Sequence, residues 1–223
     1  RTLIDAGADW RGFHIFAGSQ ALGAEAIAET QAQTVALAAD LADAIGATPP
    51  MVNLGGGFGV PYFAGDAALD IRHIGDALGE VLANSALVAA GTHFAIELGR
   101  YIAAECGVYL TRIVDIKQSH GETFWVVDGG LHHQLAASGN FGTVIRRNYP
   151  IAVAGAFAAP ATQTAHVVGC LCTPLDRLGD AVALPPADVG DLVALFLAGA
   201  YGASASPADF LGQGAAREMV IGA

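Results

Sequence analysis

Residues that could hold a phosphate group follow apolar runs of the chain. Ser19 comes after one such run, and three consecutive glycines, Gly55, Gly56 and Gly57, come after another. Glycines at a strand end let backbone N–H groups approach an anion closely, and a serine hydroxyl can donate to the same phosphate. Tyr201 follows a run of small residues and could add a phenol. Taken singly, each of these features is more often structural than functional.

Glu97 and Cys172 are two side chains that could handle protons. Glu97 ends an apolar run, where an ionised carboxylate is costly unless it is paired. An ion pair with the nearby Arg100 is the simplest interpretation of that position. Cys172 belongs to a residue type that is usually buried and structural. A chemical role for either side chain therefore needs support from the rest of the sequence.

Two pairs of adjacent residues allow further interpretations. His132 and His133 suggest a metal site, but adjacent histidines on a strand or turn should point apart, and no cysteine or carboxylate spacing completes a zinc site. We therefore expect no bound metal. Arg146 and Arg147 could meet a carboxylate or a phosphate, although a solvated basic pair is the simpler interpretation.

Repeated strand–helix units are expected to position the first group of residues. Apolar runs that begin at residues 12, 51 and 93 read as strands, and residues 25–45 and 71–83 have the apolar spacing of helices. Repeats of this kind imply parallel strands, with functional groups at the carboxyl ends of the strands. A complete eight-fold barrel takes about 250 residues, so we expect residues 1–104 to be the C-terminal part of a barrel whose N-terminal part is missing.

The second half of the chain changes to a strand-rich pattern with little helix. Short strands with turn signals between them are predicted at residues 107–117, 123–129, 166–172, 190–197 and 217–221. We therefore expect residues 105–223 to form a separate all-β domain. The predicted fold class is α/β plus all-β, a partial (β/α)8 barrel followed by a β-domain.

Composition narrows the classes of partner. Ten basic and 21 acidic residues give a formal net charge of −11, which repels nucleic-acid phosphate and anionic lipid. No uninterrupted apolar run has the length needed to span a membrane. The three cysteines are an odd number, and a reducing compartment, the cytoplasm, is the simpler expectation.

Six segments, in this order, resemble the fold-type III pyridoxal-phosphate decarboxylases, a family that includes diaminopimelate and ornithine decarboxylases. They lie at residues 12–20, 53–59, 97–101, 127–130, 169–172 and 199–202. Six ordered motifs are far more specific than any one alone. Residues 13–20 and 132–142 look most like the branch associated with exosortase systems and with decarboxylation of carrier-protein-bound glutamate.

The resemblance implies a role for each candidate residue, with pyridoxal 5'-phosphate as cofactor. Glu97 would face the pyridine nitrogen and keep it protonated, and Cys172 would protonate the substrate carbon after CO₂ leaves, reaching across a homodimer interface. Asp128 would bind an amine or shape the pocket, and Arg146 would meet a substrate carboxylate or the phosphate arm of a carrier protein. The cofactor-binding set would be Phe16, Ser19, Gly55, Gly56, Gly57, Glu97, Gly99, Arg100 and Tyr201.

Three positions depart from the expected pattern. Phe16 stands where the family usually has a histidine stacked on the cofactor, and His14 lies two residues earlier on the same strand face. Thr173 stands where the diamino enzymes carry an acidic residue, which argues against a diamino substrate. The single lysine, Lys117, lies in a predicted polar turn, in the wrong place for the Schiff-base lysine with which the family's chemistry begins.

Several function classes remain open at this point. A decarboxylase of an amino acid or a carrier-bound aminoacyl group is favoured. The alternatives are a diaminopimelate-type decarboxylase of a free amino acid, a racemase on the same barrel, and a catalytically inactive binding homologue. A dead homologue would be expected to lose Glu97 or Cys172, and both are present.

Overall fold

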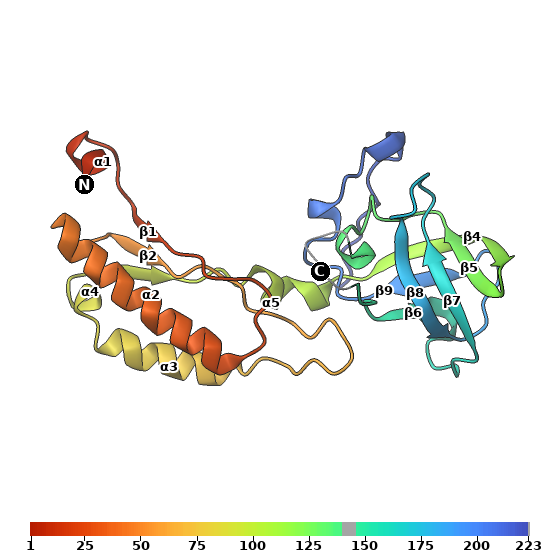
Figure 1. Ribbon diagram of the computed structural model, residues 1–223, viewed down its shortest axis with the longest axis horizontal. Coiled ribbons are helices and arrows are strands. Elements are labelled where there is room, and N and C mark those ends of the chain that lie inside the picture. The colour runs from red at the N-terminus through yellow and green to blue at the C-terminus, as the bar shows by residue number, and fades with distance from the viewer. Residues whose placement is uncertain (140–145, 223) are drawn as a thin grey trace. The chain divides into compact units, whose positions relative to one another are not determined.

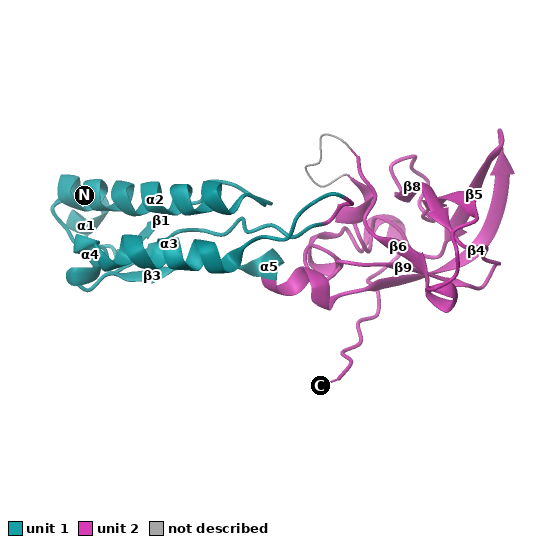
Figure 2. Ribbon diagram, turned by 90° about the horizontal axis from the view of Figure 1, so that it is seen from below, with its two compact units in different colours: residues 1–61, 65–101 teal, residues 62–64, 102–223 magenta. Residues whose placement is uncertain are grey.

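The chain forms two compact units. The computed structural model describes residues 1–139 and 146–222 (Figure 1). The first unit consists of Arg1–Pro61 and Gly65–Tyr101, and the second of Tyr62–Ala64 and Ile102–Ala223 (Figure 2).

The first unit is a small parallel sheet with helices packed against it. Its strands lie in the order β1 (Gly12–His14), β2 (Met51–Asn53) and β3 (His93–Ala95), and all three are parallel. The accompanying helices are α1 (Thr2–Asp5), α2 (Ala24–Ile45), α3 (Ile71–Ala83), α4 (Ala86–Ala89) and α5 (Gly99–Ala103). The two long helices, α2 and α3, lie side by side (Figure 1).

The ends of the long helices follow from local sequence signals. α2 stops where Gly46 adopts a left-handed conformation with φ of 63°, which glycine allows at little cost. Asp70 caps α3, because its side chain accepts hydrogen bonds from the backbone N–H groups of Arg72 and His73. No helix in residues 1–139 or 146–222 is both long enough and apolar enough to cross a membrane.

Side chains alternate along the strands, so that one face of the sheet packs against the helices and the other face presents polar groups. Val52 and Leu54 are buried with Val35 and Leu87 in the main core cluster of this unit. Because successive side chains of a strand point to opposite faces, the residue between the two buried ones, Asn53, projects to the other side of the sheet. Polar groups at the strand ends therefore escape burial against the helices.

The second unit is a mixed sheet of six strands in the order β6-β9-β4-β5-β7-β8. Every neighbouring pair is antiparallel except β5 and β7, which are parallel. The strands are β4 (Tyr109–Ser119), β5 (Glu122–Val127), β6 (Ile151–Val153), β7 (Gln163–Val168), β8 (Arg177–Leu184) and β9 (Leu192–Leu195). Short 3-10 turns occur at Ala104–Cys106, Ala136–Ser138, Ala154–Ala156, Ala203–Ala205 and Phe210–Gly212.

The core of the second unit is built from alternating residues of these strands. Trp125, Ile113, Leu178 and Leu195 are fully buried and belong to one cluster. A sheet with its own core agrees with the predicted change from strand–helix repeats to a strand-rich domain.

Several predicted element boundaries are wrong in detail. The strand expected at residues 166–172 ends at Val168, so Cys172 lies in a loop, which turns back because the Gly169 N–H donates to Asp176 O at 2.8 Å. Lys117 lies within β4, paired with Phe124, and the turn comes later. Residues 217–221 form no strand, and β6 and β8 were not predicted.

A matched pair of glycine substitutions tests the packing of the first unit. Gly12 has φ of 120°, and a Cβ added there would overlap Met51 O, so Gly12→Ala should lower the free energy of unfolding by about 2 kcal/mol or more. Gly79 lies inside α3 with open space around it, so Gly79→Ala should raise it by about 0.5–1 kcal/mol. Urea denaturation of both variants gives the two values. Equal effects at the two positions would contradict the described strand pairing.

Candidate functional site

A polar cluster lies at the carboxyl ends of the three parallel strands. His14 ends β1, Asn53 ends β2, and Glu97 follows β3 by two residues. Asn53 Nδ2 donates to Glu97 Oε1 at 2.8 Å, and His14 Nε2 lies 3.6 Å from Glu97 Oε2. Glu97 is therefore held by an amide and an imidazole, and not by the ion pair with Arg100 that was the simplest interpretation of the sequence. The Glu97 side chain remains 54% exposed and is accessible to a ligand.

The three glycines bring backbone segments into close contact at this end of the sheet. A Cβ added to Gly56 would overlap Glu97 O, and one added to Gly57, which has φ of 90°, would overlap Gly18 O. Only glycine permits both contacts. Among the described residues, the N–H groups of Gly56 and Gly57 have no hydrogen-bond partner, and both residues are only partly buried.

Arg100 is tied to the segment that carries Ser19. Arg100 Nη1 donates to Gln20 Oε1 at 2.7 Å, and Gln20 Nε2 donates to Val60 O at 2.6 Å. Ser19 itself is exposed, and its Cα lies 3.5 Å from a Cβ added to Gly57. Sequence reasoning missed the part played by Gln20, although its position directly after Ser19 in the matched motif was a signal.

The remaining predicted residues of the first unit lie at the same end of the sheet. Phe16 is 58% exposed, and its ring carbon Cδ2 lies 3.3 Å from a Cβ added to Gly55. Gly99 begins α5, is exposed, and has open space around its Cα. The predicted cofactor residues of this unit therefore come together as one cluster.

In the second unit, the segments that carry Asp128 and Cys172 lie against each other. Asp128 follows β5, and its Oδ1 accepts hydrogen bonds from Thr111 Oγ1 and Arg112 N, each at 2.8 Å. The Cys170 N–H donates to Gly129 O at 3.2 Å, which joins the Cys172 loop to the Asp128 segment. Both Asp128 and Cys172 are exposed, as a substrate contact requires.

Tyr201 lies on a loop that is locked to residues 130–139. Tyr201 has φ of 56°, an uncommon conformation for an aromatic residue, and is 41% exposed. A Cβ added to the next residue, Gly202, would lie 2.7 Å from Gln134 Oε1. Ser206 Oγ donates to Gly202 O at 2.7 Å and accepts from Leu135 N at 2.9 Å. These contacts fix the backbone that presents the Tyr201 phenol.

The histidine pair is arranged differently from the prediction. His132 and His133 lie in a turn but do not point apart, since their ring centroids are 4.0 Å apart. His133 Nδ1 lies 3.0 Å from Tyr109 Oη, and burial raises the pKa of Tyr109 to about 12. His132 is 1% exposed, and burial lowers its pKa. In the described ranges no three potential metal-ligating side chains gather.

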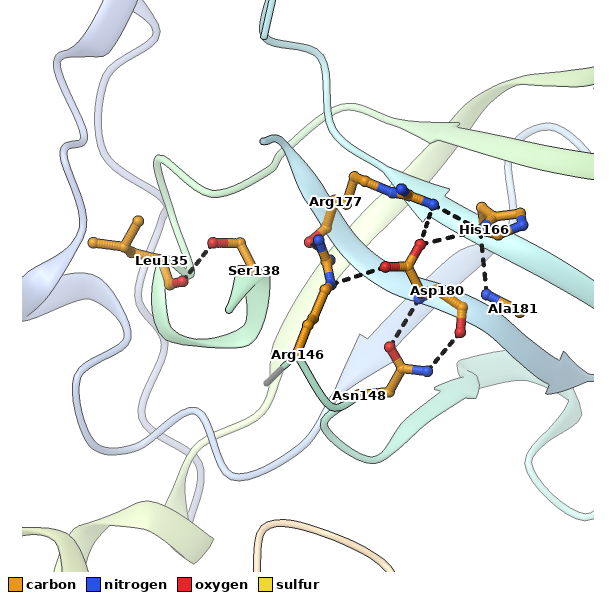
Figure 3. Close-up of polar contacts among 8 residues, drawn as sticks. All are labelled: Leu135, Ser138, Arg146, Asn148, His166, Arg177, Asp180 and Ala181. Carbon is orange, nitrogen blue, oxygen red and sulfur yellow. Dashed lines mark hydrogen bonds and ion pairs between the residues drawn. The ribbon is translucent and has the colours of Figure 1, made fainter. Parts of the chain in front are cut away.

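Arg146 and Arg147 are not a solvated pair. Arg146 Nε lies 3.0 Å from Asp180 Oδ2, and Arg177 pairs with the same carboxylate (Figure 3). The Arg147 guanidinium carbon lies 4.1 Å from the centroid of the Phe63 ring. Both cations thus have partners within the second unit. Part of the predicted carrier-associated stretch, residues 140–142, lies outside the described residues.

Comparisons with known proteins identify the family of the chain. Residues 19–199 match the family model described as pyridoxal-dependent decarboxylase, C-terminal sheet domain. Over 205 residues the chain is 40% identical to an L-glutamyl-[BtrI acyl-carrier protein] decarboxylase of Niallia circulans, covering 90% of this chain and 48% of that protein. It is 31% identical over 192 residues to a diaminopimelate decarboxylase of Archaeoglobus fulgidus, covering 86% and 44%.

A solved structure shares the architecture. Diaminopimelate decarboxylase from Helicobacter pylori, complexed with L-lysine, superimposes with a TM-score of 0.68 at 28% identity, covering 87% of this chain and 45% of that one. The chain spans about half the length of the curated relatives that it matches. The predicted fold class and the predicted pyridoxal cofactor are confirmed at the level of the family. The chain belongs to the pyridoxal-dependent decarboxylase family.

Proposed function

We propose that the protein to which this chain belongs decarboxylates a carrier-protein-bound aminoacyl group, with pyridoxal phosphate as cofactor. The observation that carries the proposal is the cluster at the strand ends of the first unit, where a carboxylate, unpaired backbone amides and an arginine lie together. Residues 1–104 supply barrel strands to the cofactor site, and residues 105–223 form the β-domain that contributes Cys172 and Asp128.

The donors of the first unit fit a phosphate group. The N–H groups of Gly56 and Gly57 have no partner in the described chain, and the Ser19 hydroxyl is exposed beside them. Arg100 adds a positive charge that Gln20 orients. Backbone amides, a hydroxyl and a guanidinium are the groups that hold phosphate oxygens in proteins. Tyr201 is proposed to complete this set with its phenol.

When bound, pyridoxal phosphate supplies an electron sink for the electron pair left behind when CO₂ departs. Glu97 holds a proton on the pyridine nitrogen, because its carboxylate accepts that N–H. Asn53 keeps the carboxylate in place through its 2.8 Å hydrogen bond to Oε1. Phe16, exposed at the same end of the sheet, offers a ring face for stacking without offering a proton.

The second unit handles the substrate. Cys172 Sγ delivers a proton to the substrate α-carbon after CO₂ has left. Asp128, anchored through Oδ1, presents its remaining oxygen to an amine of the substrate. Arg146 as a ligand for a substrate carboxylate remains a prediction, and its ion pair with Asp180 would have to be shared with that ligand.

The substrate assignment rests on Thr173 and on the relatives. Thr173 carries no charge at the position where the diamino enzymes have an acid. The relative from Niallia circulans is named for decarboxylation of a carrier-bound glutamyl group. A diaminopimelate-type reaction on a free amino acid is the second candidate, because other relatives are diaminopimelate decarboxylases at 31% identity.

We further propose a homodimer with shared active sites, working in the cytoplasm. The support for the dimer is the family resemblance of Cys172, which implies that this thiol enters the site of the partner. The support for the compartment is that Cys106, Cys170 and Cys172 are all free thiols.

Removing Arg100 tests the cofactor site. In the full-length protein, Arg100→Ala should raise the dissociation constant for pyridoxal phosphate at least about tenfold, because a charge-assisted hydrogen bond contributes about 1.5–3 kcal/mol. Arg72→Ala, on the surface of α3, is the matched control and should leave cofactor affinity unchanged. Cofactor titration followed by absorbance measures both. Equal affinity in the two variants would reject the phosphate assignment.

A substrate panel tests the proposed reaction. CO₂ release from carrier-bound glutamate should exceed release from free glutamate, lysine, ornithine and diaminopimelate by at least about tenfold in kcat/KM, since Thr173 offers no charge to a distal ammonium. Cys172→Ala should lower the yield of the correct amine from the preferred substrate. Efficient turnover of a free diamino acid would establish the second candidate instead.

Complementation between variants tests the shared site. Glu97→Gln and Cys172→Ala homodimers should each be impaired. If one protomer's Glu97 works with its partner's Cys172, random exchange places one intact site in half of the dimers and restores up to about a quarter of the sites. No recovery in verified heterodimers would mean that each site is built within one chain.

A further inference from the structure

Asp176 is a buried acidic residue that the proposed reaction does not use. It ends the loop that carries Cys170, Cys172 and Thr173, and it is 3% exposed. An ionised carboxylate in such a place is costly unless hydrogen bonds replace its lost hydration. The hydrogen-bond partners of this carboxylate therefore indicate its structural role.

The two carboxylate oxygens of Asp176 bind two different loops. Oδ1 accepts the backbone N–H of Leu131 at 2.6 Å, and Oδ2 accepts the backbone N–H of Leu171 at 2.9 Å. Leu171 immediately precedes Cys172, and Leu131 lies three residues after Asp128. One side chain thus links the segment that carries the thiol to the segment that carries the carboxylate of the proposed substrate site.

The surrounding backbone is shaped to admit this carboxylate. A Cβ added to Gly130 or to Gly169 would overlap the Asp176 carboxylate oxygens. The backbone of Asp176 also closes its own loop, since its carbonyl accepts the Gly169 N–H at 2.8 Å and its N–H donates to Thr173 O at 3.2 Å. Two glycines, two side-chain bonds and two backbone bonds therefore converge on one residue.

We propose that Asp176 is a positioning residue, which holds Cys172 in register with Asp128 by bridging their two loops. The inference rests on the proposed function for the role of Cys172 as proton donor. Hydrogen bonds from backbone amides to a carboxylate are charge-assisted and are stronger than neutral ones. The loop that carries Cys172 is exposed at the thiol, and the buried bridge gives it a defined position.

Asp176→Asn in the full-length protein is the test variant. It keeps the shape of the side chain but replaces one acceptor oxygen by an NH₂ group, which faces a backbone donor. Asp191→Asn is the matched control, because Asp191 Oδ2 also accepts a backbone N–H, that of Asp188 at 2.8 Å, in a different loop of the same unit. Thermal melts of both variants establish that they are folded.

The first readout is the alkylation rate of Cys172 by iodoacetamide, measured by peptide mass spectrometry relative to Cys106 in the same sample. Asp176→Asn should raise this ratio at least about fivefold, because the loop loses the tether that restricts its motion and the thiol becomes easier for the reagent to reach. The ratio in Asp191→Asn should equal that of the wild type. An unchanged ratio in folded Asp176→Asn would overturn the proposal.

The second readout needs no variant. Amide hydrogen exchange of the wild-type protein should show Leu131 and Leu171 protected, although both lie outside the strands, since Asp176 binds both N–H groups. Exchange of these two amides as fast as that of exposed loop residues would overturn the bridge even if Asp176→Asn fails to fold.

Measurements of enzyme activity distinguish the positioning role of Asp176 from the proposed role of Cys172 as proton donor. With the preferred substrate, Asp176→Asn should lower kcat about tenfold with KM changed less than about twofold, because a misplaced proton donor affects the step after binding. Asp191→Asn should retain both values. Full yield of the correct amine in Cys172→Ala would count against Cys172 as the proton donor, while the alkylation and exchange results would still decide whether Asp176 positions its loop.

Discussion

The close backbone contact at Gly56 and Gly57 is the constraint on which the first unit depends. These two residues touch the backbone at Glu97 and at Gly18, so the ends of all three strands meet there. The contact leaves amide N–H groups without partners while it brings Ser19 and Glu97 beside them. A side chain at either glycine would separate the segments and would disturb the proposed anion site and the Glu97 carboxylate together. The same close backbone contact therefore explains both how the strand ends pack and which groups they present to a ligand.

The second unit reaches a comparable result with side chains. Asp176, buried directly before β8, joins two loops, and Ser206 joins the Tyr201 loop to Leu135. These bonds lie behind exposed groups, so Cys172, Asp128 and Tyr201 can face a ligand while their backbones are held. The proposed chemical groups of this unit lie on loops, and hydrogen bonds from buried polar residues hold the backbones of those loops in fixed positions.

The sequence predicted the two long helices and the starts of the first three strands, because their signals are local. The third run, residues 93–100, was predicted to be a strand to its end, but β3 ends at Ala95 and α5 begins at Gly99. The apolar period of α2 and α3, the glycine after α2 and the strand-end position of Glu97 need no tertiary information. The predictions that failed depended on distant contacts. The strand expected through Cys172 ends early because Asp176 pulls the chain back, and β6 is a short strand defined by its pairing with β9. The partners of Arg146 and Glu97 likewise come from residues far away in the chain, Asp180 and Asn53.

The proposed use of the backbone amides of Gly56 and Gly57 also bears on how such a protein diversifies. Those N–H groups are the same whatever side chains surround them, so the proposed cofactor end of the site would be little affected by most point substitutions. Asp128 and Thr173 lie on loops of the other unit, and Asp176 bridges these loops through the backbone N–H groups of Leu131 and Leu171. In the described part of the chain, the Thr173 hydroxyl takes part in this loop only by accepting a 3.3 Å hydrogen bond from the Leu175 N–H. If Thr173 faces the substrate as proposed, a substitution at this position would change the group that meets the substrate while the Asp176 bridge stays in place, so one scaffold could serve different substrates.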